Sequence, residues 1–175
     1  LMDHYKDQIL ACDFFTVETA FLKTFYVLFF IEIGSRQVHL AGVTTNPDAL
    51  WVTQQARQIV WELADRDPPP RFLIRDNDKK FGAHFADVTD NIDILKTPVH
   101  APKANAVCEH FIGSVRRECL DHVIILNERH LRRLIHEYVD YFNHARPHQG
   151  IDRIPDPPET DRKAVAQTDQ PVIAV

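Results

Sequence analysis

Two apolar segments near the start of the chain set the class of fold that it can adopt. Residues 8–15 (QILACDFF) and 25–33 (FYVLFFIEI) are rich in aromatic and β-branched side chains, and each has the length of a buried strand. Gly34 and Ser35 supply a turn, and residues 37–43 (QVHLAGV) have the composition of a return strand. The second and third strands therefore form a hairpin, so the predicted sheet begins antiparallel.

A helix separates this hairpin from a fourth strand. We expect it to begin at Asn46, because Asn caps helices, Pro47 suits the first helical position and Asp48 complements the positive end of the helix dipole. The helix should reach about Ala64, before the sequence DPPP, and residues 71–75 then form the fourth strand. Its apolar positions are Ala49, Val52, Ala56, Ile59, Val60 and Leu63. This strand–helix–strand order favours a parallel crossover that places the fourth strand beside the first.

The remaining elements complete an α/β pattern. A helical segment near 79–88 precedes a strand at 92–96, a helix runs from about 104 to 120, and a last helix runs from an Asn127 cap to about Asn143. The apolar stripe of the last helix comprises Leu131, Leu134, Ile135, Tyr138 and Phe142. This order of elements predicts a ribonuclease H-like fold, with a five-stranded mixed sheet flanked by helices.

The composition indicates one globular domain with a polar tail. The chain has 175 residues, of which 45% are hydrophobic, and we expect a core at 1–152 and a flexible Pro-rich tail at 153–175. No stretch approaches the roughly 18 apolar residues of a membrane span, and the first residues lack the pattern of a secretion signal, so we expect a cytoplasmic protein without a membrane partner. The net charge of −5 argues against nucleic-acid binding through bulk positive charge, although it allows a local basic strip.

Cysteine and histidine spacing gives little sign of a structural metal. The three cysteines are Cys12, Cys108 and Cys119. They form no C-x-x-C pair, so we expect buried thiols. His144 and His148 have the spacing of a helical metal pair, but Pro147 between them disfavours a continuous helix and hence a zinc site.

Acidic side chains stand in or at the end of two predicted strands. Asp13 interrupts an apolar strand, and Asp76 ends the fourth strand in the segment FLIRDNDKKF, two positions before Asp78. Parallel neighbours would bring Asp13 and Asp76 within roughly 5 Å laterally, close enough to share a metal ion beyond the carboxyl ends of the strands. The alternatives are an Asp-Asn-Asp turn for Asp76 and Asp78, and a buried acid satisfied by an arginine or by backbone amides for Asp13.

A third acidic candidate lies on the helix predicted near 104–120. Helical periodicity gathers its apolar residues on one face and places Glu109 at the flank of that face. Asn105 and Arg116 project in nearly the same direction, with the small Gly113 nearby, so the strip can complete a metal site and contact a phosphate. The alternative for Glu109 is an ordinary solvated helix position.

Four segments carry a resemblance to a known family. ACDFFTVET, FLIRDNDKKF, TPVHAPKANAVCEHFIGSVRRECLDH and YVDYFNHARPHQGI resemble the catalytic core of DDE integrases and transposases, the retroviral-integrase-like recombinases of bacterial insertion sequences. Asp13, Asp76 and Glu109 match the three catalytic acids, the last two 33 positions apart. Asp78 stands where the family often has Gly, which leaves it as an alternative ligand, and His110 stands where Arg or Ser often follows the Glu.

The resemblance implies an enzyme that cleaves phosphodiester bonds and transfers DNA strands in transposition or integration. Asp13, Asp76 and Glu109 would hold two divalent ions, Mg²⁺ or Mn²⁺ because the ligands are hard oxygens. DNA and further copies of the chain are the implied partners. The expected phosphate contacts are Lys103, Asn105, Arg116 and Arg117, unless these side chains form an ordinary charged helix surface. Two alternative functions stay open: a stand-alone nuclease of the same fold, and a catalytically decayed module for DNA binding or self-association.

Overall fold

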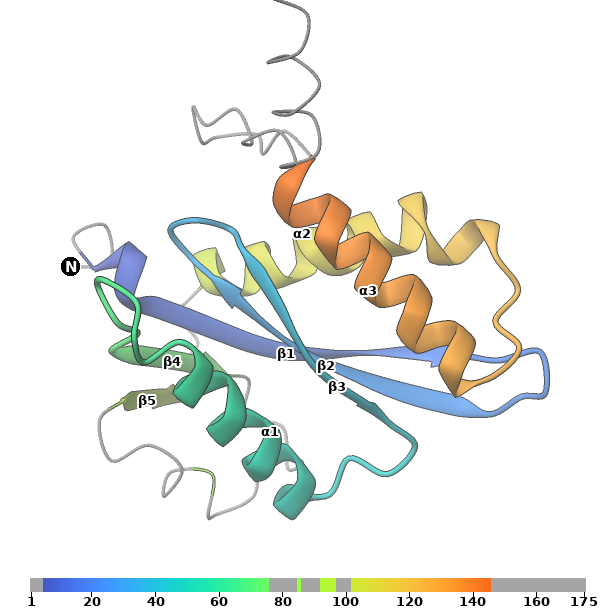
Figure 1. Cartoon of the computed structure of the whole chain (residues 1–175), viewed down its shortest axis with the longest axis horizontal. Helices are drawn as coiled ribbons and strands as arrows, with labels where there is room; N and C mark the ends of the chain where they lie inside the picture. Colours follow the sequence, from blue (N-terminus) through green and yellow to red (C-terminus); the bar gives the residue numbers. More distant parts are fainter. Residues whose placement is uncertain (1–4, 76–84, 86–91, 97–101, 146–175) are drawn as a thin grey trace, which may run out of the picture.

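The chain folds into one mixed sheet with helices on both faces (Figure 1). The computed structural model describes residues 5–75, 85, 92–96 and 102–145. In chain order the elements are β1 (Ile9–Glu18), β2 (Thr24–Glu32), β3 (Val38–Thr44), α1 (Ala49–Glu62), β4 (Phe72–Arg75), β5 (Asp93–Lys96), α2 (Pro102–Glu118) and α3 (Glu128–His144), with 3₁₀ turns at Lys6–Gln8 and Leu120–His122. No helix in these ranges is both long enough and apolar enough to cross a membrane.

The five strands follow the order β3-β2-β1-β4-β5. β1 pairs antiparallel with β2, and β2 pairs antiparallel with β3. On its other side β1 pairs parallel with β4, which in turn pairs parallel with β5. The predicted hairpin, the parallel crossover through α1 and the five-stranded mixed sheet are therefore confirmed.

Strand alternation gives the central strand β1 two apolar faces. Ile9, Ala11, Phe15 and Val17 lie in the cluster that includes the buried faces of α2 and α3. Leu10 and Cys12 lie in the cluster that includes α1. Because side chains along a strand alternate between its faces, Asp13 belongs to the α2 side of the sheet.

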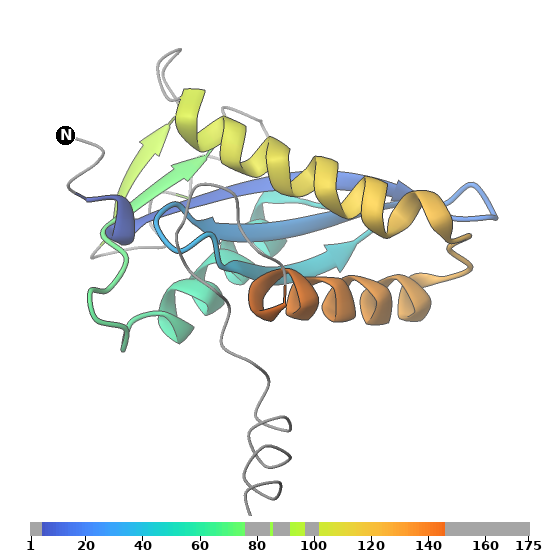
Figure 2. The ribbon, with the colours of Figure 1, turned by 90° about the horizontal axis from the view of Figure 1, so that it is seen from above.

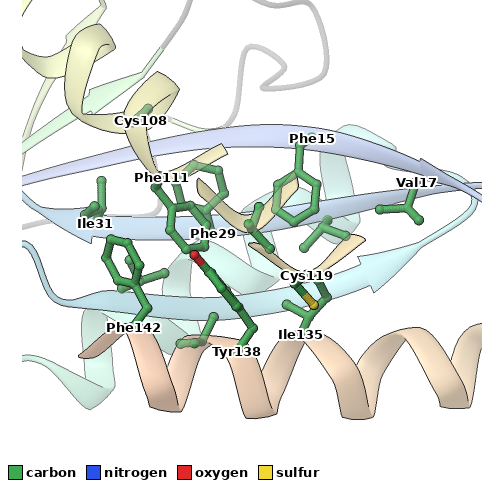
Figure 3. Close-up of a cluster of buried hydrophobic side chains, with 14 of the residues drawn as sticks. Phe15, Val17, Phe29, Ile31, Cys108, Phe111, Cys119, Ile135, Tyr138 and Phe142 are labelled. Atoms are coloured by element: carbon green, nitrogen blue, oxygen red, sulfur yellow. The ribbon is translucent and has the colours of Figure 1, made fainter. Parts of the chain in front are cut away.

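Phe111 of α2 lies at the centre of the larger cluster (Figure 3). Its ring centroid is 4.7 Å from that of Phe29 on β2 and 5.1 Å from that of Phe142 on α3. The rings of Phe15 and Tyr138 surround the same side chain. Phe111 of α2 therefore contacts both the sheet and α3, as expected for a residue on the predicted apolar face of this helix.

The start of α1 differs from the prediction. Asp48, not Asn46, is the N-cap: its backbone is extended and its side chain accepts a hydrogen bond of 2.8 Å from the amide of Trp51. The amide of Asn46 instead donates a hydrogen bond to Thr44 Oγ1, and both Asn46 and Pro47 precede the helix. Ala49 is exposed as a result, whereas Val52, Ala56 and Ile59 are buried as predicted.

The last helix begins and packs as predicted. Asn127 caps α3, accepting a hydrogen bond of 2.9 Å from the amide of His130. Leu134 is only partly buried, and Val139, which the prediction omitted, is buried. All three cysteines are free and buried, which confirms that prediction. The predicted helical segment near 79–88 and the predicted tail lie outside the described residues, apart from Phe85.

Two side chains of α3 complete the edge strand β3. The amide of Val38 donates to Asn143 Oδ1, and Asn143 Nδ2 donates to the Val38 carbonyl, both at 2.8 Å. Arg132 donates to the carbonyl of Val43 at 2.5 Å. These bonds satisfy part of a strand edge that would otherwise present open backbone groups.

A polar cluster on Glu32 holds the turn between β2 and β3. Its carboxylate accepts a hydrogen bond from Ser35 at 2.5 Å, contacts His39 Nε2 at 2.7 Å and pairs with Arg66 at 2.6 Å. Burial alone would raise the pKa of Glu32, but the hydrogen bonds from His39 and Ser35 and the charge of Arg66 together lower it. The folded state therefore favours the ionised carboxylate.

We predict that Phe111→Ala lowers the free energy of unfolding by about 3–5 kcal/mol, because it leaves a cavity where five aromatic rings meet. Phe111→Leu should lose clearly less. The control is Phe21→Ala, whose side chain is exposed and whose effect should stay within about 0.5 kcal/mol. Urea unfolding of the three variants measures this, and similar losses in Phe111→Ala and Phe21→Ala would contradict the assignment of the core.

We predict that Glu32→Gln destabilises the fold at pH 7 by about 1–2 kcal/mol, because it weakens a partly buried charged network. Since the pKa of Glu32 is lowered on folding, its stabilisation is complete above the unfolded-state pKa and disappears as pH falls through the folded-state pKa. The difference between wild type and variant in urea unfolding should therefore shrink in acid. A difference that is constant with pH would contradict the role of the ionised group, and exposed Glu62→Gln is the control.

Candidate active site

Asp13 directly follows the last described pair in the parallel part of the sheet. The last described pair between β1 and β4 is Cys12 with Arg75, so Asp13 is the first residue of β1 beyond it, while its other side still pairs with Phe29. Asp13 is only partly buried, whereas a residue inside an apolar strand would be expected to be fully buried. One of its carboxylate oxygens accepts a hydrogen bond of 2.7 Å from the amide of Phe14. The acid therefore lies beyond the carboxyl end of β4, where open α/β sheets place their sites.

Glu109 reaches the same region from α2. It is exposed, while its neighbour Cys108 is buried in the cluster under α2. Burial raises the pKa of Cys108, and the charges of Asp13 and Glu109 raise it further. Glu109 is next to Cys108 in the chain, and the charge of Asp13 acts on the same thiol, so Asp13 lies near the part of α2 that carries Glu109.

Arg75 is a buried cation beside this neighbourhood that the sequence reasoning missed. It is 6% exposed, and its guanidinium carbon lies 5.4 Å from the centroid of the Phe85 ring. Burial raises the pKa of Cys12 well above its usual value, Cys108 and Asp13 raise it further, and the charge of Arg75 opposes them. Because Arg75 pairs with Cys12 and stacks on Phe85, it lies on the α1 face, opposite to the side of Asp13. The sequence did offer one signal for a buried Arg75: it is the last residue of the apolar strand FLIR.

The second predicted acid lies outside the described residues. Asp76 follows Arg75 directly in the chain, and neither Asp76 nor Asp78 is described. Among the residues that are described, no group of three or more His, Cys, Asp or Glu side chains could hold a metal ion. Asp13 and Glu109 both offer carboxylate oxygens, which suit Mg²⁺ or Mn²⁺, so the donor type fits a divalent ion even though the full ligand set is not described.

The predicted phosphate contacts follow α2. Asn105, Arg116 and Arg117 are exposed, and the side chain of Lys103 lies outside the described residues. Arg116 donates to the carbonyl of Thr16 at 3.1 Å, so it lies along β1 three residues after Asp13. Arg117 folds back along its own helix, because a Cβ added at Gly113 would lie 2.9 Å from its guanidinium.

The histidine pair considered for zinc is only half described. His144 is exposed, and its Nδ1 lies 3.1 Å from Asp140 Oδ1 and 3.0 Å from the Asp140 carbonyl. His148 lies outside the described residues. This part of the chain therefore adds no support for a zinc site.

Known proteins share this architecture. The family model of the integrase core domain matches residues 90–155. The HTLV-2 integrase catalytic core domain in complex with magnesium is similar with a TM-score of 0.63 and 12% identity, over 82% of this chain and 90% of that one. The Mos1 mariner transposase catalytic domain is similar with a TM-score of 0.62 and 15% identity, over 83% and 76%. No protein of curated function matches the sequence.

One of the similar proteins is considerably longer than this chain. A chain in the simian T-cell lymphotropic virus intasome is similar with a TM-score of 0.65 and 12% identity, over 87% of this chain, which spans 58% of that one. The resemblance to an integrase or transposase core is thus confirmed, together with the ribonuclease H-like fold. Because the identities are so low, the chemistry has to be argued from the residues of this chain.

We predict that Arg116→Ala lowers the free energy of unfolding by about 0.5–1 kcal/mol, because it removes the bond between α2 and β1 at Thr16. Arg117→Ala is the matched control, since its guanidinium lies beside its own helix, and it should change stability less. Urea unfolding at one salt concentration measures both. Equal effects of the two variants would contradict a specific tie between α2 and β1.

Proposed function

We propose that the chain is the catalytic core of a metal-dependent DNA recombinase, which cleaves phosphodiester bonds and transfers DNA strands. The observation that carries this proposal is that Asp13 follows the last described pair of β1 and β4 and lies near the part of α2 that carries Glu109, since its charge acts on the adjacent Cys108. The integrase-core match and the fold support the same reaction class. Two acids from a strand and a helix, at the carboxyl edge of a sheet, suit phosphoryl chemistry better than acyl or hydride transfer.

Asp13, Asp76 and Glu109 are the proposed ligands of two divalent ions, with Asp78 as the alternative to Asp76. When bound, the ions would activate a water or 3′-hydroxyl for attack and stabilise the leaving oxygen. The raised pKa of Cys108 keeps this thiol neutral at physiological pH, so the site offers carboxylate oxygens rather than a thiolate. That donor set favours Mg²⁺ or Mn²⁺ over zinc, and the HTLV-2 core was solved with magnesium.

DNA is the proposed substrate, held by the polar strip of α2. Asn105 and Arg116 are exposed on the helix that carries Glu109, and Arg116 lies against β1. With Lys103 and Arg117 they would contact phosphates and fix the register of the strand, without reading its sequence. We also propose a homo-oligomer, because joining two DNA ends in concert requires two active sites, and a cytoplasmic location.

We predict that Asp13→Asn, Asp76→Asn and Glu109→Gln each reduce strand transfer at least about 10³-fold, because each removes a charged ligand. The assay uses a branched DNA that carries a 3′-hydroxyl at the branch point. It measures, in Mn²⁺, the joining of this hydroxyl that reseals the duplex, which is the reverse of strand transfer. Asp121→Asn, on the exposed turn after α2, is the control and should keep activity. A second measurement is the melting temperature with added Mn²⁺, which should rise in wild type and in Asp121→Asn but not in Asp13→Asn.

The same assay separates the alternatives. Cleavage without joining would favour the stand-alone nuclease, and DNA binding without either reaction would favour the decayed module. Activity near wild type in Asp13→Asn or Glu109→Gln, with the variant shown to be folded, would refute the proposed site.

A further inference from the structure

The turn between β1 and β2 presents two large apolar side chains to solvent. Phe21 and Leu22 are each 80% exposed, at the end of the hairpin that projects from the body of the molecule (Figure 1). The turn is nevertheless well ordered. The Thr19 amide donates to the Lys23 carbonyl at 2.9 Å, the Leu22 amide donates to the Thr19 carbonyl at 2.9 Å, and Thr19 is buried. The hairpin therefore holds Phe21 and Leu22 in fixed positions.

Leu22 adopts a backbone conformation that costs energy. Its φ is 59°, in the left-handed region where a side chain with a Cβ is disfavoured and glycine is the usual residue. The side chain gains nothing from burial in return, because it points into solvent. Leu22 therefore occupies the left-handed position of a short hairpin loop, where glycine is the usual residue, and its large apolar side chain is left in solvent.

The connection between α2 and α3 enlarges this apolar area. The Ala20 amide donates to the Ile125 carbonyl at 2.8 Å, which fixes the hairpin against that connection. Ile124 is 73% exposed and Leu126 is 52% exposed. Together we call Phe21, Leu22, Val123, Ile124 and Leu126 the hairpin surface.

The hairpin surface lies in line with the candidate active site. β1 continues from Asp13 to Glu18, which is roughly 17 Å at about 3.3 Å per residue, or about five base pairs of a DNA duplex. α2 lies along β1 and ends beside the hairpin (Figure 2), and Arg116 contacts β1 at Thr16, between the acid and the tip. A DNA strand held at Asp13 that runs past Arg116, in the direction in which β1 continues, would therefore approach Phe21.

The charge of this end of the molecule suits a polyanion. The hairpin at 16–26 and the segment 113–133 together carry six Lys or Arg and four Asp or Glu, whereas the whole chain has a net charge of −5. Lys23 is exposed directly beside Leu22, with its Nζ 5.5 Å from the centroid of the Phe25 ring. This end therefore carries a small excess of positive charge in a chain that is acidic as a whole, and Lys23 stands next to the apolar tip.

From these observations we infer that the hairpin surface binds the DNA that flanks the scissile phosphodiester, with Phe21 and Leu22 wedged against bases that are locally unstacked. Apolar wedges of Phe and Leu are a known way for proteins to deform a duplex, and flanking cations hold the backbone. The inference rests on the proposed function, because the active site fixes where the DNA begins. It adds that the substrate is deformed about five to eight base pairs from the reacting phosphate, a span estimated from the rise of β1.

The test compares the affinity of the full chain for two duplexes of about 30 base pairs, both nicked at one position. One is fully paired, and the other has three mismatched pairs about six pairs from the nick. Because mismatches are already partly unstacked, wild type should bind the mismatched duplex about tenfold more tightly. Fluorescence anisotropy without divalent metal measures binding separately from cleavage.

Two double variants are matched in chemistry and exposure. Phe21→Ala with Leu22→Ala should reduce the preference to less than about twofold, because it removes the wedge. Leu50→Ala with Trp61→Ala, which removes two equally exposed apolar side chains from α1, should retain it. Asp13→Asn should lose cleavage and joining and keep the preference, so failure of the proposed function and failure of this inference are distinguishable.

Two results would overturn the inference. The first is an equal affinity of wild type for the two duplexes, and the second is an undiminished preference in the hairpin variant. In the second case, loss of a wild-type dimer by the hairpin variant in sedimentation would make a second copy of the chain the occupant of this surface.

Discussion

The pairing of β1 is the constraint on which the rest of the molecule depends. This strand is ten residues long and pairs along its length with β2. Among the described residues, its last pair with β4 is Cys12 with Arg75, and Asp13 is the next residue of β1. Asp13 is only partly buried, so its carboxylate costs less than a completely desolvated charge. It lies on the side of the sheet that α2 covers.

The two faces of the sheet carry opposite charges near Asp13. On the α1 side, Arg75 is buried against Phe85 and brings a positive charge close to the sheet edge. On the α2 side, Glu109 is exposed and adds a second negative charge near Asp13. Burial is the main reason that the pKa of Cys108 is raised, and the charges of Asp13 and Glu109 raise it further. A divalent cation bound at the proposed site would offset these negative charges.

Local sequence patterns predicted most of the fold, because a single local feature, such as apolar composition or a capping residue, determined most elements. The aromatic and β-branched runs gave β1, β2 and β3, and Asn127 gave the start of α3. The start of α1 was wrong because two residues that can cap a helix, Asn46 and Asp48, stand two positions apart, and Asp48 is the one whose side chain accepts the amide of Trp51. Arg75 was missed for a related reason: nothing in the chain nearby shows that Phe85 will lie against it.

The candidate site was predictable to a smaller extent than the fold. Periodicity placed Glu109 at the flank of its helix, and strand order placed Asp13 near the end of the fourth strand, but the proximity of the two residues depends on how α2 crosses β1. That crossing is set by the packing of Phe111 against Phe29, which no local pattern contains. Asp76 and Asp78 still stand as alternatives, because both follow β4 beyond the described residues.

The acidic balance of the chain is compatible with DNA binding once the distribution of charge is considered. At physiological salt, charges act over about 8 Å, so a phosphate near α2 is influenced by Arg116 and its neighbours rather than by acids at the other end of the molecule. A weakly basic end on an acidic body would give modest affinity and strong dependence on salt. If the hairpin surface binds DNA as inferred, its apolar contacts would add binding energy that salt does not screen. Such contacts would matter more on a chain with few cations than on a strongly basic one.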